Sequence, residues 1–257
     1  SYAWSAILLK TGAELELISD PKILDIFEKS KRGGLTFAGS KRYVKTNNQH
    51  IAGCDPKSKS TYLLYLDANN LYGWAMVQAL PYKDIKFSNE TTLEPILNTD
   101  DDATIGYMVE IDLSFDASIH EKLIQMPPCP ESIIPKEEWF SEYQKLVAKT
   151  TKSNTKCAKL VPHLNEYLKY CIHYRNLKFI KQLGVTLGTA HNVISFTQDK
   201  WMEPYILAHN KLRTQASLDK NKVLLDLFQL MNNSVFGKTC ENVRNCMNDN
   251  LTTNQTN

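Results

Sequence analysis

The sequence predicts an α/β fold, from two strand-like segments and a strongly amphipathic helix. Residues 61–66 form a short apolar run, and residues 104–115 are rich in β-branched and aromatic side chains, which is typical of strands. Residues 219–236 carry apolar side chains at helical spacing and polar ones on the opposite face. A chain of 257 residues is long enough to bury a sizeable core.

The remaining elements follow from local signals along the chain. Residues 21–30 predict a helix with proline in its first turn, and residues 73–81 predict a short helix that a proline ends. The proline-rich residues 126–135 predict a loop. Residues 184–198 predict two short strands around a glycine turn, and residues 199–216 predict a helix before the amphipathic one.

The composition is that of a globular protein without a strong overall charge. A net charge of +2 and a pI near 8.1 give no global field toward nucleic acid, so binding of a polyanion must use local basic surface. No apolar run approaches the roughly 20 residues of a membrane span, and we expect no membrane partner. Six cysteines without a C-x-x-C pair predict a reducing, intracellular setting.

One carboxylate stands at a conspicuous position. Asp67 ends the predicted strand 61–66, and a predicted helix follows almost at once. A hard oxygen ligand on a rigid strand end suits Mg²⁺, and the N–H groups at the start of a helix attract anions. Taken alone, the same acid is also typical of a turn or a helix cap.

Three segments together resemble the motifs of family-B DNA polymerases. Residues 67–72, DANNLY, resemble motif A (D-x-x-S-L-Y-P), and residues 233–238, NSVFGK, resemble motif B (K-x-x-x-N-S-x-Y-G). Residues 31–34, KRGG, lie where the protein-primed members carry a Y-x-G-G element. The segments occur in the family's order and are most similar to polymerases of Polinton/Maverick-type transposons, adenovirus-like elements and linear plasmids.

The resemblance implies a domain organisation. The fold would be a partial polymerase palm with an inserted α/β region and a helical fingers element. Residues 1–60 would end the connection between exonuclease and palm, and residues 61–84 would carry palm motif A. Residues 85–200 would be the inserted region that contacts the terminal protein and the template, and residues 201–257 would be the fingers helices with motif B.

The resemblance also implies a site and its ligands. Asp67 would be the catalytic carboxylate and, with the carbonyl of Ala68, a ligand of Mg²⁺ or Mn²⁺. The ring of Tyr72 would exclude a 2′-hydroxyl. The expected partners are a DNA primer-template, deoxynucleoside triphosphates and a terminal priming protein. Nucleotide-binding residues would be Asn70, Leu71, Tyr72, Arg213, Gln229, Asn233, Phe236 and Gly237, and DNA-binding residues Arg32, Gly33, Gly34, Lys41, Arg42 and Lys238.

Two departures from the family pattern set the functional expectation. Gln229 stands where motif B has a lysine, and an amide can hydrogen-bond to phosphate but cannot neutralise it. No D-T-D element, the family's motif C, follows Lys238 in this sequence. We therefore expect part of a DNA-directed DNA polymerase that does not extend primers alone. The alternative is a non-catalytic module that binds nucleic acid or a terminal protein, or a decayed mobile-element relic.

Other polar clusters have simpler explanations. Glu110 and Asp112, two residues apart on a predicted strand, share one face and predict a charged, solvated one. The acids 100–102 predict a solvated loop. The spacing of Cys157, His163, Cys171 and His173 fits no known zinc finger, and it predicts buried cysteines and histidines flanked by aromatic rings.

Overall fold

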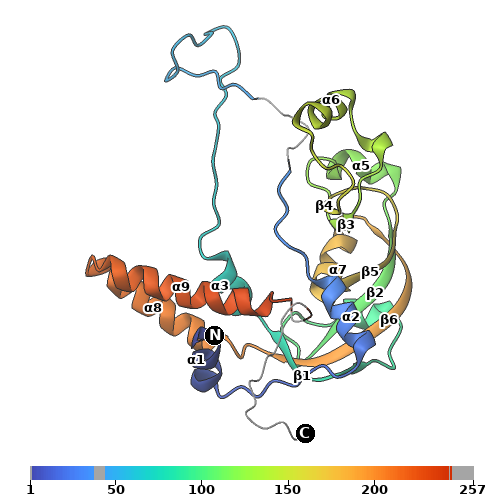
Figure 1. Ribbon diagram of the computed structural model, residues 1–257, viewed down its shortest axis with the longest axis vertical. Coiled ribbons are helices and arrows are strands. Elements are labelled where there is room, and N and C mark those ends of the chain that lie inside the picture. The colour runs from blue at the N-terminus through green and yellow to red at the C-terminus, as the bar shows by residue number, and fades with distance from the viewer. Residues whose placement is uncertain (1, 38–43, 243, 245–257) are drawn as a thin grey trace, which may run out of the picture. The chain divides into compact units, whose positions relative to one another are not determined.

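The computed structural model describes residues 2–37, 44–242 and 244, and the chain divides into two compact units. The helical unit comprises Ser1–Leu15, Asn69–Leu80 and Asp199–Asn257, and the sheet unit comprises Glu16–Ala68 and Pro81–Gln198. Helices and strands both contribute substantially (Figure 1). The prediction of a mixed α/β fold is therefore confirmed at this level.

The sheet unit is built on a four-stranded sheet with the order β1-β6-β2-β5. Strand β6 pairs antiparallel with β2, and β2 pairs antiparallel with β5. The long strands of this sheet are curled (Figure 1). The register shifts between Glu110 and Leu113, as bulges do when they bend a strand. The strands are β1 (Leu80–Phe87), β2 (Ile105–Ser114), β5 (Tyr167–His173) and β6 (Thr186–Asp199).

Helices cover both faces of this sheet. Val109 and Ile111 of β2 share one core cluster with Leu177 of α7 (Tyr174–Gln182). Met108, whose side chain points the other way, shares a second cluster with Ile26 of α2 (Pro21–Ser30). Helices α4 (Leu93–Leu97) and α5 (Ala117–Leu123) add apolar side chains to the first cluster. Burial on both faces explains why β2 is almost continuously apolar.

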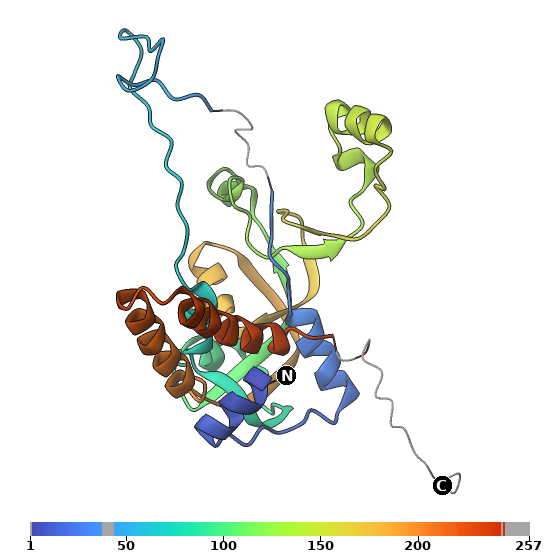
Figure 2. The same ribbon diagram turned by 60° about the vertical axis from the view of Figure 1, so that its left-hand side comes forward.

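In the sheet unit, two short paired strands flank a segment that contains two helices. Strands β3 (Glu131–Ile133) and β4 (Lys159–Val161) pair antiparallel, and the chain between them forms η1 (Glu137–Trp139) and α6 (Glu142–Thr151) (Figure 2). Ser141 begins α6 with a reciprocal capping box to Gln144. No residue of α6 is buried, so local capping rather than packing defines where this helix begins.

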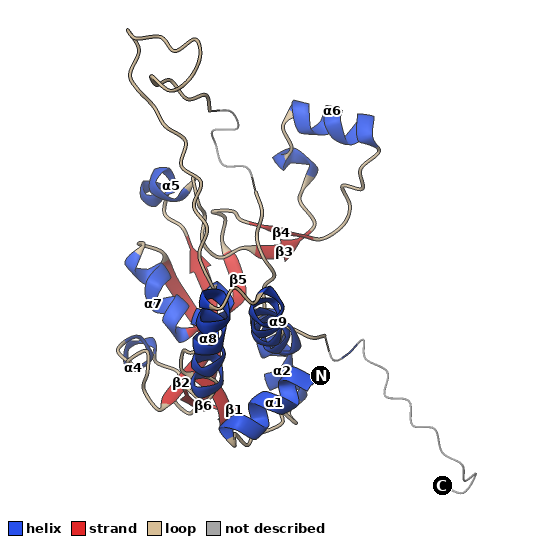
Figure 3. Ribbon diagram, turned by 90° about the vertical axis from the view of Figure 1, so that its left-hand side faces the viewer, coloured by secondary structure: helices blue, strands red, loops and turns tan. Residues whose placement is uncertain are grey.

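The helical unit consists of α1 (Tyr2–Thr11), α3 (Leu71–Met76), α8 (Glu203–Leu218) and α9 (Lys222–Thr239) (Figure 3). Helices α8 and α9 are consecutive and pack along each other, and α1 and α3 both contact α9. The core of the unit joins Ile7, Met76, Ile206 and Val235, one from each helix. No helix in the described part of the chain is long and apolar enough to cross a membrane.

The predicted strand at residues 61–66 is wrong. Only Thr61 makes a bridge, to Asn47, and residues 62–66 run as irregular chain. Their side chains are largely exposed, with Tyr65 at 93% and Leu64 at 80%. A strand needs a neighbour to satisfy its backbone groups, and within the described residues this run has none beyond Thr61. Asp67 therefore does not stand on a strand end in this structure.

Two predictions about the sheet unit also need correction. Residues 126–135 are not all loop, because Glu131–Ile133 forms β3. Instead of two short strands in residues 184–198, the chain forms one long strand, Thr186–Asp199, because Gly188 does not turn the chain. A Cβ at Gly188 would lie 3.1 Å from the carbonyl oxygen of Asp112, so this glycine permits close approach of β2.

The two predicted C-terminal helices are confirmed as α8 and α9, with two differences. Helix α9 continues through Gly237 to Thr239, because Gly237 does not adopt the left-handed conformation that ends a helix. The predicted apolar stripe is also exposed in its first half, where Val223 is 77% exposed. Only Asn232 and Val235 of α9 are buried, in the half where the core of the helical unit lies.

Candidate functional site

Two aromatic rings join the segments that resemble motif A and motif B within the helical unit. Tyr72 in α3 stacks on Phe236 in α9, with ring centroids 4.1 Å apart and planes inclined by 7°. The two rings lie face to face, and Tyr72 remains 48% exposed. Stacked rings of this kind stabilise a contact by about 0.5–1.5 kcal/mol beyond burial. The structure therefore brings together the two aromatic residues that the sequence predicted for one site.

Asn70 is the N-cap of α3 and has a left-handed backbone conformation. Its φ of 52° lies in the left-handed region, which asparagine tolerates better than most residues. The side chain folds over Gly73, where an added Cβ would come within 2.3 Å of Asn70 Nδ2. From there Nδ2 donates a hydrogen bond of 3.4 Å to Oδ1 of Asn210 in α8. Asn70 is thus tied to α8, the helix that precedes α9.

This amide contact continues into α9. Nδ2 of buried Asn232 donates to the same Asn210 Oδ1 at 3.4 Å, and His209 Nδ1 lies 3.0 Å from Asn232 Oδ1. Because a carboxamide oxygen only accepts, His209 carries its proton on Nδ1. Burial lowers the pKa of His209 below its usual value, against the opposing effect of the hydrogen bond to Asn232, and so favours the neutral ring. The network fixes α3, α8 and α9 relative to each other without using a charge.

Arg213 lies at a hollow beside this network. The hollow has a volume of about 340 Å³ and is lined by Asn70, Asn210, Arg213, Thr214, Ser217 and Leu225. Arg213 Nη2 donates a hydrogen bond of 3.0 Å to Oε1 of Gln229 in α9. The predicted nucleotide-binding residues Asn70 and Arg213 therefore line one space large enough for phosphate groups, and Gln229 bonds to Arg213 without lining that space.

Other predicted site residues of the helical unit face solvent. Asn233 is exposed and its side chain makes no hydrogen bond within the described residues, so its carboxamide is available to a ligand. Leu71 and Gly237 are also exposed, and a Cβ at Gly237 would meet no described atom within 4 Å. Lys238 forms an ion pair with Glu241. These positions are open to a ligand, with Lys238 already paired.

Asp67 and Ala68 are the last residues of the sheet unit before the chain enters the helical unit. Both are exposed, and the Asp67 carboxylate has no hydrogen-bond partner in the described part of the chain. The predicted anion site at the start of the next helix is not supported, because α3 has only 6 residues. Among the described residues no three His, Cys, Asp or Glu side chains gather as a metal site.

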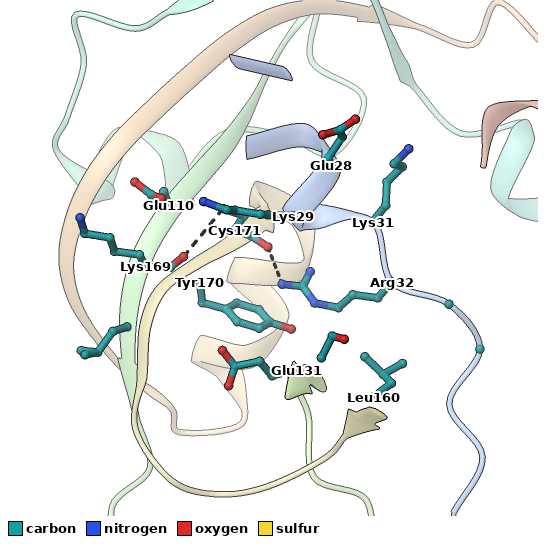
Figure 4. A pocket seen from close by; sticks show the side chains of 14 residues that line it. Glu28, Lys29, Lys31, Arg32, Glu110, Glu131, Leu160, Lys169, Tyr170 and Cys171 are labelled. Atoms are coloured by element: carbon teal, nitrogen blue, oxygen red, sulfur yellow. Dashed lines mark hydrogen bonds between the residues drawn. The ribbon is translucent and has the colours of Figure 1, made fainter. Parts of the chain in front are cut away.

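The KRGG segment leaves α2 beside a second hollow, of about 600 Å³ (Figure 4). Arg32 is anchored there by the protein itself. Its Nε, Nη1 and Nη2 donate to the carbonyls of Pro130, Ser30 and Cys171 at 3.1, 2.9 and 2.9 Å. The guanidinium also lies 3.9 Å from the ring centroid of Tyr170. Three of its five N–H donors are thus used inside the protein.

The ammonium groups of this hollow are more accessible than Arg32. Lys31 and Lys169 are exposed, and Lys29 pairs with Asp25 at 2.7 Å. Gly33 and Gly34 follow Arg32 with no described atom within 4 Å of an added Cβ. Glu28, Glu110 and Glu131 also line the hollow, so it presents carboxylates as well as lysines and bare backbone, while Arg32 holds the segment in place. The predicted DNA contacts Lys41 and Arg42 lie outside the described residues.

We expect Arg32→Ala to lower the free energy of unfolding of the sheet unit by about 2–4 kcal/mol, since it leaves three carbonyls without a charged donor. Chemical denaturation followed by far-UV circular dichroism measures the change. Lys31→Ala is the matched control, because it removes one exposed positive charge next to Arg32 and should change stability by less than about 0.5 kcal/mol. Equal effects of the two substitutions would contradict an anchoring role for Arg32.

The prediction of a solvated face for Glu110 and Asp112 is wrong for Glu110. Glu110 is only 6% exposed, because it lies on the face of β2 that α2 covers, and it accepts a 2.6 Å hydrogen bond from Asn192. Asp112 accepts from the backbone N–H of Lys169 and pairs with His191, both at 2.8 Å. These bonds, that from Lys169 first, lower the pKa of Asp112.

The histidines of the zinc-like grouping do lie against aromatic rings. His163 stacks on Tyr167 at 4.2 Å, and His173 lies 4.7 Å from Tyr174. Cys171 is buried, and burial raises the pKa of its thiol to about 11, which keeps it protonated at neutral pH. Cys157 is only partly buried, so the prediction of buried cysteines holds for Cys171 alone. The acids 100–102 form the predicted loop, although Asp101 pairs with Arg175 and Lys178.

The sequence analysis missed His209, Asn210 and Asn232. Asparagine and histidine are poor helix formers, and their presence inside two predicted helices was the available signal. Which of them face each other depends on how α8 packs on α9, and periodicity does not define that register. Comparison of the chain with models of protein families, with curated proteins and with solved structures gave no match.

Proposed function

We propose that this chain is the nucleotide-binding part of a DNA-directed DNA polymerase of family B, of the protein-primed type. Its substrate class would be deoxynucleoside triphosphates, paired with a primer-template. The observation that supports the proposal is the stacking of Tyr72 on Phe236 at 4.1 Å, because it unites the two segments that resemble motifs A and B. Helices α3, α8 and α9 would then correspond to the base of the fingers with the motif A turn.

The chemistry of the helical unit suits a nucleoside triphosphate. The exposed part of Tyr72, whose ring stacks on Phe236, offers an apolar platform for a sugar or base. Asn233 has a free carboxamide one helical turn before Phe236, within reach of the same ligand. Arg213 supplies a planar cation at the edge of the 340 Å³ hollow, which suits phosphate oxygens. A platform, an amide and a cation are the groups that a nucleotide requires.

Magnesium would be held by Asp67 and the carbonyl of Ala68 together with phosphate oxygens of the nucleotide. A Mg²⁺ ion usually takes one or two protein carboxylates and completes its shell with phosphate and water, so the exposed Asp67 fits as a single ligand. The ion would neutralise the charge of the triphosphate. The residues of this chain would position the nucleotide, and the second carboxylate of the family's two-metal site is not among those assigned here.

Tyr72 would control the choice between deoxynucleotides and ribonucleotides. Its ring is held flat by Phe236, so a 2′-hydroxyl would meet a surface that cannot move aside. We expect the wild-type chain to bind dATP with Mg²⁺ at a Kd of about 10 µM to 1 mM, the usual range for enzyme substrates. ATP should bind at least about tenfold more weakly, and Tyr72→Ala should reduce that ratio to near one.

Isothermal titration of dATP and ATP into both proteins measures the ratio. Tyr72→Phe is the control, because it keeps the ring and should keep the preference. Equal affinity of the wild-type chain for dATP and ATP would contradict this role of Tyr72, and absence of dATP binding would contradict the proposed function.

A second candidate, a non-catalytic nucleic-acid-binding module, is favoured by the hollow beside the KRGG segment. Exposed Lys31 and Lys169, with the bare backbone of Gly33 and Gly34, would meet the phosphates of a single strand, against repulsion from Glu28, Glu110 and Glu131 in the same hollow. The two candidates differ in a measurable way. A binding module would retain oligonucleotide in low salt and show no affinity for free dATP, whereas the polymerase part would bind both.

A further inference from the structure

Gln229 departs from the resembled motif, and the structure shows what it does. Its Oε1 accepts the 3.0 Å hydrogen bond from Arg213 Nη2, across the contact between α9 and α8. Gln229 itself is exposed and does not line the hollow, whereas Arg213 is partly buried and does. The glutamine therefore contacts the arginine without itself lining the space that a ligand would fill.

Arg213 is the source of positive charge at this hollow. Among the described residues that line it, Arg213 alone carries a charge. The hydroxyl of Thr214 donates to the carbonyl of Asn210 in its own helix, so it is not a donor for a ligand. The side-chain amide of Asn70 donates to Asn210. An anion that enters the hollow would therefore depend chiefly on the guanidinium, whose remaining N–H groups form a planar fork.

We propose that Gln229 is a positioning residue that orients the Arg213 guanidinium toward the phosphates of the bound nucleotide. In this chain Arg213, held by Gln229, would supply the charge that the motif B lysine supplies in the resembled family. The proposal rests on the proposed function, because it assigns the ligand as a nucleoside triphosphate. A neutral acceptor is the suitable partner, since a lysine at position 229 would put a like charge next to the guanidinium and remove its hydrogen bond.

A double-mutant cycle tests this relation. The probes are dATP and inorganic tripolyphosphate, both with Mg²⁺, titrated calorimetrically into the wild-type chain, Arg213→Ala, Gln229→Ala and the double variant. We expect Arg213→Ala to weaken binding of both probes at least about tenfold and Gln229→Ala about three- to fivefold. Because Gln229 acts through Arg213, the double variant should bind as Arg213→Ala does. Gln215→Ala is the matched control, since Gln215 bonds Asp219 outside the hollow and should leave both affinities unchanged.

A spectroscopic measurement separates positioning from a general loss of structure. The Nη–H signals of Arg213 in nitrogen-15 NMR should be resolved in the wild-type chain and averaged by rotation in Gln229→Ala, while the backbone spectrum is unchanged. Gln229→Glu should keep the signals resolved but weaken tripolyphosphate binding, because the carboxylate neutralises the guanidinium.

The outcomes distinguish the inference from the function. If the wild-type chain binds dATP and Gln229→Ala weakens it equally with and without Arg213, Gln229 contacts the nucleotide directly and the inference is overturned while the function stands. If tripolyphosphate binds as tightly as dATP and the cycle shows coupling, Gln229 positions Arg213 at a general anion site and the proposed nucleotide function is contradicted. If neither probe binds, both are overturned.

Discussion

Replacing Phe196 by alanine is expected to lower the free energy of unfolding of the sheet unit by about 3–5 kcal/mol, the usual cost of emptying a buried phenylalanine site. Phe196 in β6 is fully buried and lies 6.2 Å from Phe27 of α2 and 5.8 Å from the ring of His173. It faces Gly106 across the β2–β6 pair, where a Cβ would come within 2.4 Å of its ring. The ring therefore fills space that two strands and α2 leave for it.

Chemical denaturation of Phe196→Ala, followed by tryptophan fluorescence and circular dichroism, measures this loss. Phe179→Ala is the matched control, because Phe179 in α7 of the same unit is 56% exposed and its truncation should cost less than about 0.5 kcal/mol. A loss below about 1 kcal/mol in Phe196→Ala would mean that this side of the sheet is not closed by α2.

Acid is expected to destabilise the sheet unit through His173. Burial, with a smaller contribution from the nearby Arg175, lowers the pKa of His173 from 6.5 to about 4. Its Nδ1 accepts the backbone N–H of Arg175 at the start of α7, and a protonated Nδ1 could not accept. The unfolded chain therefore takes up a proton at higher pH than the folded chain. Stability should be constant above pH 6.5 and fall by about 2–3 kcal/mol as the pH drops to 4.

Unfolding free energies measured between pH 7.5 and 4 test this dependence. His173→Asn is the comparison, because asparagine keeps an acceptor at the N-cap of α7 and does not titrate. We expect the unfolding free energy of this variant to depend less on pH between 6.5 and 4. Stability lost with the packing of the imidazole ring is the same at each pH and does not alter this slope. The ion pair of Asp101 with Lys178 lowers the pKa of Asp101. Protonation of Asp101 therefore changes the unfolding free energy in more acid solution than protonation of His173 does, and the comparison stays valid. An unchanged slope in His173→Asn would contradict the assignment.

The predictable part of the fold is the part that local signals encode. Helix α2 begins at Pro21 with Asp20 as its cap, and β2 and α9 follow from apolar periodicity. The strand predicted at residues 61–66 was wrong because its residues favour strand, while a strand forms only beside a partner, which sequence alone does not identify. Gly188 predicted a turn for a similar reason, because its close approach to Asp112 is a tertiary contact.

The candidate site also combines features that the sequence predicted with features that depend on tertiary packing. The resemblance placed Tyr72 and Phe236 in one site, and the structure stacks them. It did not indicate that Asn210 would receive bonds from both Asn70 and Asn232, since that depends on the register of α8 on α9. For Arg32, the sequence predicted a ligand contact, and the structure shows contacts within the protein. A basic residue next to two glycines predicted a phosphate contact, whereas its hydrogen bonds serve three backbone carbonyls.

Mapping bound dATP on the chain by NMR tests most directly whether α3, α8 and α9 form a nucleotide site. The isotope-labelled chain is titrated with dATP and Mg²⁺, and shifts are followed at Tyr72, Arg213 and Asn233. We predict saturable shifts at these three residues and at the Asn210 side chain, with the strands of the sheet unit unchanged. Absence of shifts at millimolar dATP, or shifts confined to the hollow beside Arg32, would contradict a nucleotide site in the helical unit.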